Sequence, residues 1–327
     1  MNVTIPYGFK IGHYQDEFTG VTVLLAKKGA TGGCDCRGGA PGTRETDLLR
    51  NEKMMQKINA VVLSGGSAYG LASTCGVMEY LKDQGIGYKT MGKIVPIVCG
   101  AVLYDLNQKE YHYPTAQYGL YACKNADKTS DFGNIGAGKG ATVGKIRGLK
   151  NACKSGIGAA TVKVAGVTIT AVVAVNAMGD VVDESGKIVA GAKGKNGNFI
   201  DTEKCLANGE FAKLLLGTNT TIGCILTDAK LSKVDANRLA SISHDGMARA
   251  IRPVHTVYDG DTMFCMASGV KPVVNITILE SATVEATRQA IVNAVSASCK
   301  YDIVYDLDED GTTSRNGGEP LSAELDD

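Results

Sequence analysis

The sequence predicts an α+β protein in which helices pack over sheets. Segments rich in β-branched residues recur along the chain, and segments with apolar residues at helical spacing lie between them. Hydrophobic residues make up 44% of the 327 residues, which is enough for the core of one large domain or two modest ones. Since neither a repeat nor a low-complexity linker divides the chain, we expect these elements to form stacked layers.

The N-terminal half alternates predicted strands with glycine-rich turns. The expected order is a strand at 20–26, a loop at 38–47, a polar helical segment towards Lys57, a strand at 58–63, a turn at 64–70 and a helix at 71–83. Residues 131–145 are dense in glycine. Residues 160–164 and 167–176 are typical of a hairpin that turns near Ala165-Gly166.

The C-terminal half continues the same alternation. The expected order is a helix at 204–216, a strand at 222–226, a helix at 232–251, strands at 262–267 and 273–279, and a helix at 282–298. From Tyr301 the sequence turns acidic, and it loses apolar periodicity after Tyr305. This composition predicts a loosely ordered tail at 301–327.

The charge balance argues against two classes of partner. The chain has 34 basic and 34 acidic residues, so no overall field attracts nucleic acid or an anionic membrane surface. The first residues lack the basic and apolar regions of a signal peptide, and no apolar run reaches the length of a membrane span. We therefore expect a cytoplasmic protein that binds neither nucleic acid nor membrane.

The cysteines and the acidic tail do not indicate a metal site. The ten cysteines are scattered singly apart from Cys34-Asp35-Cys36, so they are interpreted as reduced, small apolar residues. Zinc binding by Cys34, Cys36 and His13 is conceivable, but a Cys-x-Cys beside Gly-Gly is more typical of a strand and turn. The tail repeats the first half of a calcium loop, yet Gly317 stands where that loop needs Glu. We expect no metal and no organic cofactor.

The peptide bond between Asn219 and Thr220 is the first candidate for chemistry. A hydroxyl residue can attack the carbonyl that precedes it, and hydrolysis then leaves that residue as a free N-terminus. Its own amine, which has a pKa of ~7.7–8.0, can then serve as the base for its hydroxyl. Alternatively, the tripeptide Asn219-Thr220-Thr221 is only the polar start of a β-strand in the β-branched segment 221–227. Taken alone, the tripeptide favours this second interpretation.

Three other motifs are each ambiguous alone. Gly65-Gly66-Ser67-Ala68-Tyr69 resembles a nucleophile elbow but has Tyr69 where Gly is required, which leaves a serine hydrolase with Ser67 and His255 or His244 as a minor alternative. Gly140 to Lys145 is one residue short of a phosphate loop, so Lys145 is a candidate point charge and not a nucleotide ligand. Asp259-Gly260-Asp261 is usually a solvated turn.

Taken together, the ordered motifs resemble the L-aminopeptidase/D-esterase family, the DmpA-like group that also contains β-aminopeptidases and nylon-oligomer hydrolases. The resemblance extends from about Ile11 to Ser298. It is carried by the segments Gly38 to Glu45, Leu63 to Gly70, Gly136 to Lys145, Asn219-Thr220, and His244 to Asp261. Aminopeptidases of the family commonly have Ser where this chain has Thr220, whereas the nylon-oligomer hydrolases use Thr.

The resemblance implies a fold and a processing event. The fold would be an αββα sandwich of the N-terminal-nucleophile-hydrolase type, as one catalytic domain over residues 1–300. Self-cleavage between Asn219 and Thr220 would give an α-chain, 1–219, and a β-chain, 220–327. Assembly of these αβ units into a homotetramer is also expected.

The resemblance also assigns the site residues. Thr220 would be the nucleophile, Asn176 the oxyanion donor, Lys145 a charged group beside the nucleophile, and Asp259 with Asp261 the acidic pair that orients it. The turn residues Ser64, Gly65 and Tyr69 are expected to contact substrate, because amides at such a turn can bind carboxylates and oxyanions. Lys145 is expected to stay charged and to hold this network together.

The implied activity is hydrolysis of small peptides, amides or esters through an acyl-enzyme, with release of N-terminal residues. Two alternatives remain open. Ornithine acetyltransferases have a similar fold and a Thr nucleophile, so acyl transfer is the first. An uncleaved homologue that serves as a binding or structural module is the second.

Overall fold

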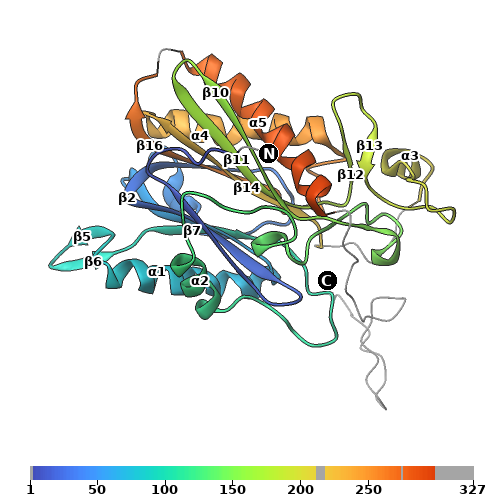
Figure 1. Ribbon diagram of the computed structural model, residues 1–327, viewed down its shortest axis with the longest axis horizontal. Coiled ribbons are helices and arrows are strands. Elements are labelled where there is room, and N and C mark those ends of the chain that lie inside the picture. The colour runs from blue at the N-terminus through green and yellow to red at the C-terminus, as the bar shows by residue number, and fades with distance from the viewer. Residues whose placement is uncertain (1–2, 211–217, 274, 299–327) are drawn as a thin grey trace, which may run out of the picture.

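Four layers make up the structure, a computed structural model that describes residues 3–210, 218–273 and 275–298 (Figure 1). Helices α4 (Lys233–Ala250) and α5 (Ile276–Ser298) cover one outer face, and α1 (Ser73–Asp83) and α2 (Ala116–Lys124) cover the other. Strands fill the two layers between these helix pairs. This arrangement is the αββα sandwich that the family resemblance implied, and it confirms the α+β layers predicted from the sequence pattern.

The two strand layers belong to one hydrogen-bonded sheet in the order β10-β11-β14-β16-β2-β4-β7-β3, with β1 paired to β2. The 17-residue strand β2 pairs with β16 near its C-terminal end and with β1 and β4 near its N-terminal end, so it belongs to both layers. The strands are β1 (Lys10–Gln15), β2 (Gly20–Cys36), β3 (Gly42–Arg44), β4 (Lys57–Ser64), β7 (Val98–Val102), β10 (Ile157–Val164), β11 (Val167–Asn176), β14 (Thr220–Ala229) and β16 (Thr262–Lys271).

Shorter elements surround this frame. The small strands are β5 (Tyr88–Thr90), β6 (Lys93–Val95), β8 (Thr142–Val143), β9 (Cys153–Lys154), β12 (Asp180–Val182), β13 (Ile188–Ala190) and β15 (Ile251–Arg252). The short helices are α3 (Thr202–Ala207) and the 3-10 turns η1 (Asp47–Leu49), η2 (Ser67–Ala72), η3 (Gly136–Gly138) and η4 (Leu149–Asn151). None of the described helices is long and apolar enough to cross a membrane.

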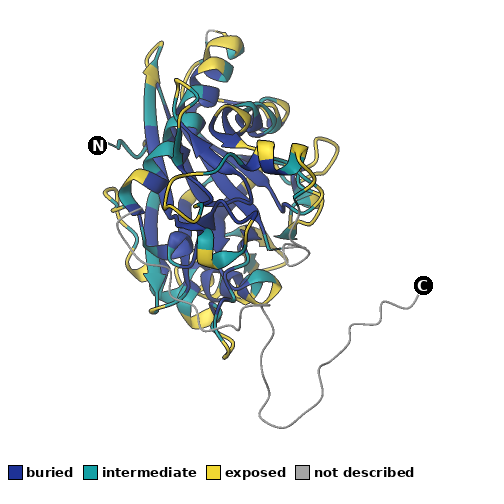
Figure 2. Ribbon diagram, turned by 90° about the vertical axis from the view of Figure 1, so that its right-hand side faces the viewer, coloured by how far each residue is buried: buried dark blue, intermediate teal, exposed yellow. Residues whose placement is uncertain are grey.

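The central strands are buried on both faces, as Figure 2 shows by their dark colour among more exposed helices. Along β11, Val172 and Ala174 pack between the two strand layers, whereas Val173 and Val175 pack towards α4 and α5. This alternation follows from the two-residue period of a strand. Because both faces are apolar, the sequence of β11 reads as a continuous β-branched and alanine run.

Most predicted elements are confirmed, with small shifts of their ends. The strands at 20–26, 58–63, 222–226 and 262–267 correspond to β2, β4, β14 and β16, and the hairpin at 160–176 corresponds to β10 and β11. The helices at 71–83 and 232–251 correspond to η2 with α1 and to α4. The helix expected at 204–216 is only α3 in its first part, and residues 211–217, like the tail 301–327, lie outside the described residues.

The polar helical segment expected towards Lys57 is wrong, because only the 3-10 turn η1 forms there. Side chains of α4 take up the backbone carbonyls that a helix would use. The Lys233 ammonium donates to the carbonyls of Leu48 and Lys53, and the Asn237 amide donates to the carbonyl of Leu49. Tertiary hydrogen bonds thus replace the local ones.

The strand expected at 273–279 is also wrong, because α5 already begins at Ile276. The Asn275 side chain accepts a hydrogen bond from the amide of Thr277 at 2.8 Å, as an N-cap residue does. Leu279, Ala282 and Ala286 then lie buried on one side of the helix. The β-branched residues of this segment suggested a strand, but the cap and the helical spacing decided the outcome.

Candidate active site

Three strand ends meet at one edge of the sheet. Thr220 begins β14 and lies opposite Asn176, the last residue of the antiparallel neighbour β11. On the other side, β16 runs parallel to β14 and begins directly after Asp261. Because β14 and β16 start where β11 ends, residues more than 40 positions apart in sequence are brought together at this edge.

The carbonyl between Asn219 and Thr220 is held by two donors. The Thr220 hydroxyl donates to the Asn219 carbonyl oxygen at 2.5 Å, and the backbone amide of Gly260 donates to the same oxygen at 2.9 Å. Asn219 and Asp259 form a parallel bridge, which fixes this contact. Both Asn219 and Thr220 are buried. The hydroxyl therefore lies beside the carbonyl group that self-cleavage would require it to attack.

Gly260 makes this close approach possible because it has no side chain. A Cβ at this position would lie 2.7 Å from the Thr220 hydroxyl oxygen and 2.8 Å from the carbonyl oxygen of Ala40. Real Cβ atoms do not approach other atoms so closely, so either Thr220 or the loop at Ala40 would have to move.

We expect the Gly260→Ala substitution to slow self-cleavage and turnover by roughly 10- to 100-fold, because displacements below 1 Å disturb a reacting pair. Intact-mass spectrometry over time measures the first rate, and a chromogenic assay measures the second. Gly269→Ala is the control, since it adds backbone strain at a surface position where no atom lies within 4 Å of the new Cβ. Equal rates for Gly260→Ala and the wild type would contradict the assigned role of this contact.

Lys145 lies beside the same strand ends and is almost fully buried. Its ammonium group donates to the Asn176 backbone oxygen at 2.9 Å, to the Asn176 side-chain oxygen at 2.8 Å and to the Thr218 carbonyl oxygen at 3.1 Å. All three acceptors are neutral oxygens. Lys145 thus connects β11 to the residues just before the Asn219–Thr220 bond.

The expectation that Lys145 stays charged needs correction. Burial lowers the pKa of Lys145 from 10.5 to about 7, although Asp259 and Asp105 oppose the shift. The desolvation of an ammonium group outweighs these attractions because neither carboxylate is hydrogen-bonded to it in the described contacts. Near neutral pH a large fraction of Lys145 is therefore a neutral amine that can accept a proton.

Asn176 is held at both ends of its side-chain amide. Its NH2 group donates to the carbonyl oxygens of Tyr104 at 2.8 Å and Thr218 at 3.2 Å. Its oxygen accepts from Lys145 and from the amide of Thr142. The orientation of the amide is thus fixed, with its NH2 group directed towards the chain segment that precedes Thr220.

The acidic pair occupies the loop that leads into β16. Asp261 accepts from the amide of Thr221 at 2.7 Å through one oxygen, which anchors the residue after the candidate nucleophile. Asp259 accepts from the amide and hydroxyl of Thr256. Burial, followed by repulsion from Asp261, raises the pKa of Asp259 to about 6. The structure therefore brings Thr220, Asn176, Lys145, Asp259 and Asp261 into one neighbourhood.

The turn residues expected to bind substrate lie on an adjoining segment. The Ser64 hydroxyl is buried and donates to the carbonyl of Gly65, and the Gly65 amide donates to the carbonyl of Gly20. Tyr69 is exposed and its ring stacks on Tyr113 with centroids 4.9 Å apart. Only Tyr69 thus presents an accessible side chain, and a substrate role for the three residues stays a prediction.

A residue that the sequence reading missed links this turn to the site. Asp105 is fully buried and accepts from the amide of Gly66 at 2.6 Å and from the hydroxyl of Thr19 at 2.8 Å. Burial raises its pKa to about 6. Its neighbour Tyr104 supplies a carbonyl to Asn176. The only signal in the sequence was its position two residues after the apolar segment 98–103, which could not indicate the contact.

The other motifs have separate partners. His255 is hydrogen-bonded to Asp261 and His244 to the carbonyl of Asp35, and no hydrogen bond in the described residues joins either ring to Ser67. The ring of His13 contacts the hydroxyls of Thr22 and Ser130. The described residues contain no group of three or more metal-ligating side chains. The arrangement of a serine hydrolase at Ser67 is therefore not formed.

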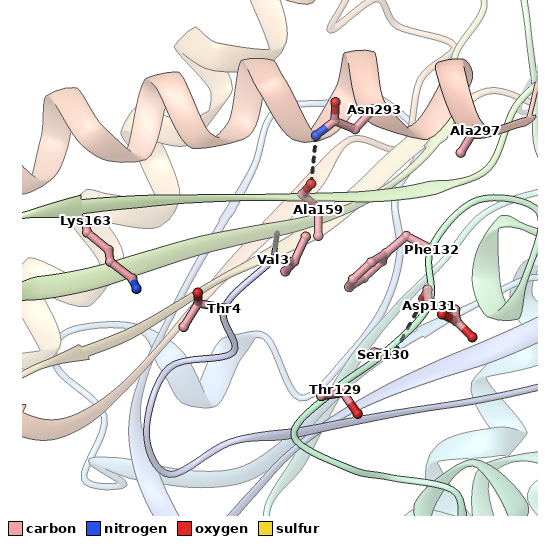
Figure 3. Close-up of a pocket in the computed structure, with 10 residues that line it drawn as sticks. All are labelled: Val3, Thr4, Thr129, Ser130, Asp131, Phe132, Ala159, Lys163, Asn293 and Ala297. Atoms are coloured by element: carbon pink, nitrogen blue, oxygen red, sulfur yellow. Dashed lines mark hydrogen bonds between the residues drawn. The ribbon is translucent and has the colours of Figure 1, made fainter. Parts of the chain in front are cut away.

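A cavity of about 640 Å³ lies away from these residues (Figure 3). It is bounded by residues 3–4 and 129–132, by β10 and by α5, and Lys163 and Asp131 lie on opposite sides of it. None of the candidate catalytic residues lines it. We therefore do not assign the substrate to this cavity.

The fold and the site together define the class of protein. The αββα layers with a hydroxyl residue at the start of a central strand are those of the N-terminal-nucleophile hydrolase fold. The L-aminopeptidase D-Ala-esterase/amidase from Ochrobactrum anthropi, whose structure is described as a variant of that fold, matches with a TM-score of 0.68. The match covers 91% of this chain and 88% of that one at 19% identity. A Burkholderia sp. β-aminopeptidase matches with a TM-score of 0.66, over 91% of this chain and 89% of its own.

The sequence comparisons identify the family. The model for peptidase family S58 matches residues 6–304, and this chain belongs to that family. An uncharacterized aminopeptidase from Mycobacterium leprae (strain TN) is 40% identical over 296 residues, 82% of this chain and 78% of the relative. A 6-aminohexanoate-oligomer endohydrolase from Paenarthrobacter ureafaciens is 32% identical over 271 residues, 80% of this chain and 73% of the relative. The chain is thus an enzyme of the peptidase and amide-hydrolase class.

Proposed function

We propose that the protein is a self-processing aminopeptidase that cleaves its own Asn219–Thr220 bond and then uses Thr220 as its nucleophile. The observation that carries this proposal is the contact between the Thr220 hydroxyl and the Asn219 carbonyl, which the Gly260 amide also holds. An amide aimed at that oxygen stabilises the negative charge that develops on attack.

Self-cleavage proceeds in two steps, an acyl shift from nitrogen to oxygen and then hydrolysis of the ester. The Thr220 oxygen attacks the Asn219 carbonyl carbon and gives its proton to a base, for which neutral Lys145 is the candidate. The bond to the Thr220 nitrogen then breaks, the nitrogen takes up a proton, and an ester joins Asn219 to the Thr220 side chain. Water hydrolyses this ester, which yields the carboxylate of Asn219 and a free Thr220 with both amine and hydroxyl.

The same groups then serve turnover. Lys145 and Asn176 both hold the Thr218 carbonyl, which belongs to the new C-terminal end of the α-chain. Departure of that end frees the Asn176 NH2 group and the Lys145 amine to face a substrate. The Thr220 amine accepts the hydroxyl proton, the hydroxyl attacks the substrate carbonyl, and Asn176 stabilises the oxyanion of the acyl-enzyme that forms.

The substrate class follows from the relatives as a proposal. Relatives and fold neighbours are named as aminopeptidases, a β-aminopeptidase and a hydrolase of 6-aminohexanoate oligomers. Short peptides or ω-amino-acid amides with a free amine fit a site that holds a buried acidic pair, since Asp259 and Asp261 can attract a cation. The same proposal has water as the acyl acceptor. It also has the αβ units assembled as a homotetramer in the cytoplasm.

Denaturing electrophoresis with N-terminal sequencing tests it. We expect two fragments, 1–219 and 220–327, and a β-chain whose first residue is Thr220. A chain that stays intact on long incubation would contradict self-processing. Amino-acid p-nitroanilides, with water or ornithine as the acceptor, then separate hydrolysis from acyl transfer. Light scattering measures whether the processed enzyme is a tetramer.

A further inference from the structure

A histidine in the loop before β16 contacts the acidic pair directly. The backbone amide of His255 and its ring Nδ1 both lie within hydrogen-bond distance of one Asp261 oxygen, at 3.1 and 2.8 Å. The other oxygen of Asp261 accepts from the amide of Thr221. One carboxylate therefore connects the histidine to the residue next to the candidate nucleophile, and a carboxylate can only accept, so Nδ1 carries the proton.

The backbone at His255 is held in an uncommon conformation to make this contact. Its φ is 59°, in the left-handed region that is uncommon for residues other than glycine and that Asn, Asp and His adopt more often than the rest. This conformation directs both the amide and the ring of one residue at the same oxygen. Such strain persists where the surrounding structure over-determines it.

A second histidine supports the ring of the first. The rings of His244, on α4, and His255 meet edge to face with centroids 4.7 Å apart. The Nε2 of His244 donates to the carbonyl oxygen of Asp35 on β2. Burial lowers the pKa of His244 to about 4, so this ring is neutral at physiological pH. The His255 ring is thus fixed between helix α4 and Asp261.

We propose that His255 is a positioning residue for the reaction: it locks the carboxylate of Asp261 so that Asp261 fixes the start of β14 and the place of Thr220. Asp261 lies beside Asp259, and a buried carboxylate with a like charge nearby needs donors to stay in place. His255 supplies two of the three donors described here. This inference rests on the proposed function.

The test compares His255→Gly with His255→Asn in the full-length chain. Both residues accept the left-handed conformation, but only Asn carries a side-chain donor that can reach Asp261. We expect His255→Gly to lower the self-cleavage rate and kcat by roughly 10- to 100-fold with KM within about threefold, because chemistry and not binding is affected. His255→Asn should recover both rates to within about fivefold of the wild type.

Ala165→Gly is the matched control, because Ala165 also has a positive φ but lies in the exposed turn between β10 and β11. It should leave both rates unchanged. Circular dichroism checks folding, and if His255→Gly does not fold, His255→Ala takes its place, because it also lacks the donor and an alanine already adopts a positive φ at Ala165.

Three results would each overturn the positioning role of His255. The Gly and Asn variants could lose equally in rate, the Gly variant could keep the wild-type rate, or the substitution could change KM alone. Failure of the proposed function is distinguishable from these outcomes. In that case the wild-type chain itself stays intact and inactive, and the variants are not needed to show it.

Discussion

The Thr220→Ala variant is expected to remain a single polypeptide and to lose at least roughly 10³-fold in turnover, because nucleophile and base are removed together. Without the hydroxyl nothing attacks the Asn219 carbonyl, and without cleavage no terminal amine is released. A denaturing gel sampled over days measures processing, and release of p-nitroaniline measures turnover.

Thr220→Ser is the matched control for this experiment. Serine keeps the oxygen that contacts Asn219 and removes only a methyl group, so processing at the same bond is expected to continue. Cleavage or turnover by the alanine variant would assign the nucleophile to another residue. A serine variant that folds but never cleaves would also contradict the mechanism, because the hydroxyl would then not be sufficient at this position.

Replacing Lys145 with methionine is expected to slow self-cleavage by roughly 10²-fold, the usual contribution of a general base. Methionine fills similar space without a charge or a proton acceptor. The three oxygen contacts of Lys145 are lost, but the Asn176 side-chain oxygen keeps the amide of Thr142, and the Thr218 carbonyl keeps the NH2 group of Asn176. The fold should therefore survive, which circular dichroism can confirm.

The pH dependence of self-cleavage distinguishes a general base from a residue that only holds the site together. With a pKa of about 7, the neutral form of Lys145 grows as pH rises, so wild-type cleavage should accelerate between about pH 6 and 8 and then level off. The Lys145→Met variant should lack this rise. If the variant kept the same pH profile at a lower rate, Lys145 would hold the site together without accepting the proton.

The lowered pKa of Lys145 also predicts how the free energy of unfolding changes with pH. Its pKa is lowered on folding, so the unfolded chain binds more protons between about pH 7 and 10.5. The cost of burying this charge is fully present below pH 7 and is relieved as pH rises towards 10.5. The wild type should therefore gain stability relative to Lys145→Met over that window, as measured by urea unfolding.

Local chemistry explains which elements could be predicted from the sequence. Strands such as β4 and β11 are largely apolar segments next to a glycine turn, and α4 begins with a Ser232–Asp235 capping box, so neighbours in sequence already specify them. Of the two wrong elements, the one at 273–279 was decided locally by the Asn275 cap, and the one before Lys57 was decided by distant groups. At 47–57 the decisive donors are Lys233 and Asn237, which lie 180 residues or more along the chain from the carbonyls they bind.

The candidate active site shows the same difference between what neighbours in sequence specify and what distant groups decide. The sequence by itself determined the αββα class, the candidate bond at Asn219–Thr220 and the residue types around it, because ordered motifs along nearly the whole chain match one family. The tertiary structure decided what those residues can do. Register placed Asn176 opposite Thr220, a missing Cβ at Gly260 let the loop reach the Asn219 carbonyl, and burial made Lys145 a potential base where a permanent charge was expected. Desolvation and close approach depend on what surrounds a group in space, and a list of its neighbours in sequence does not contain that information.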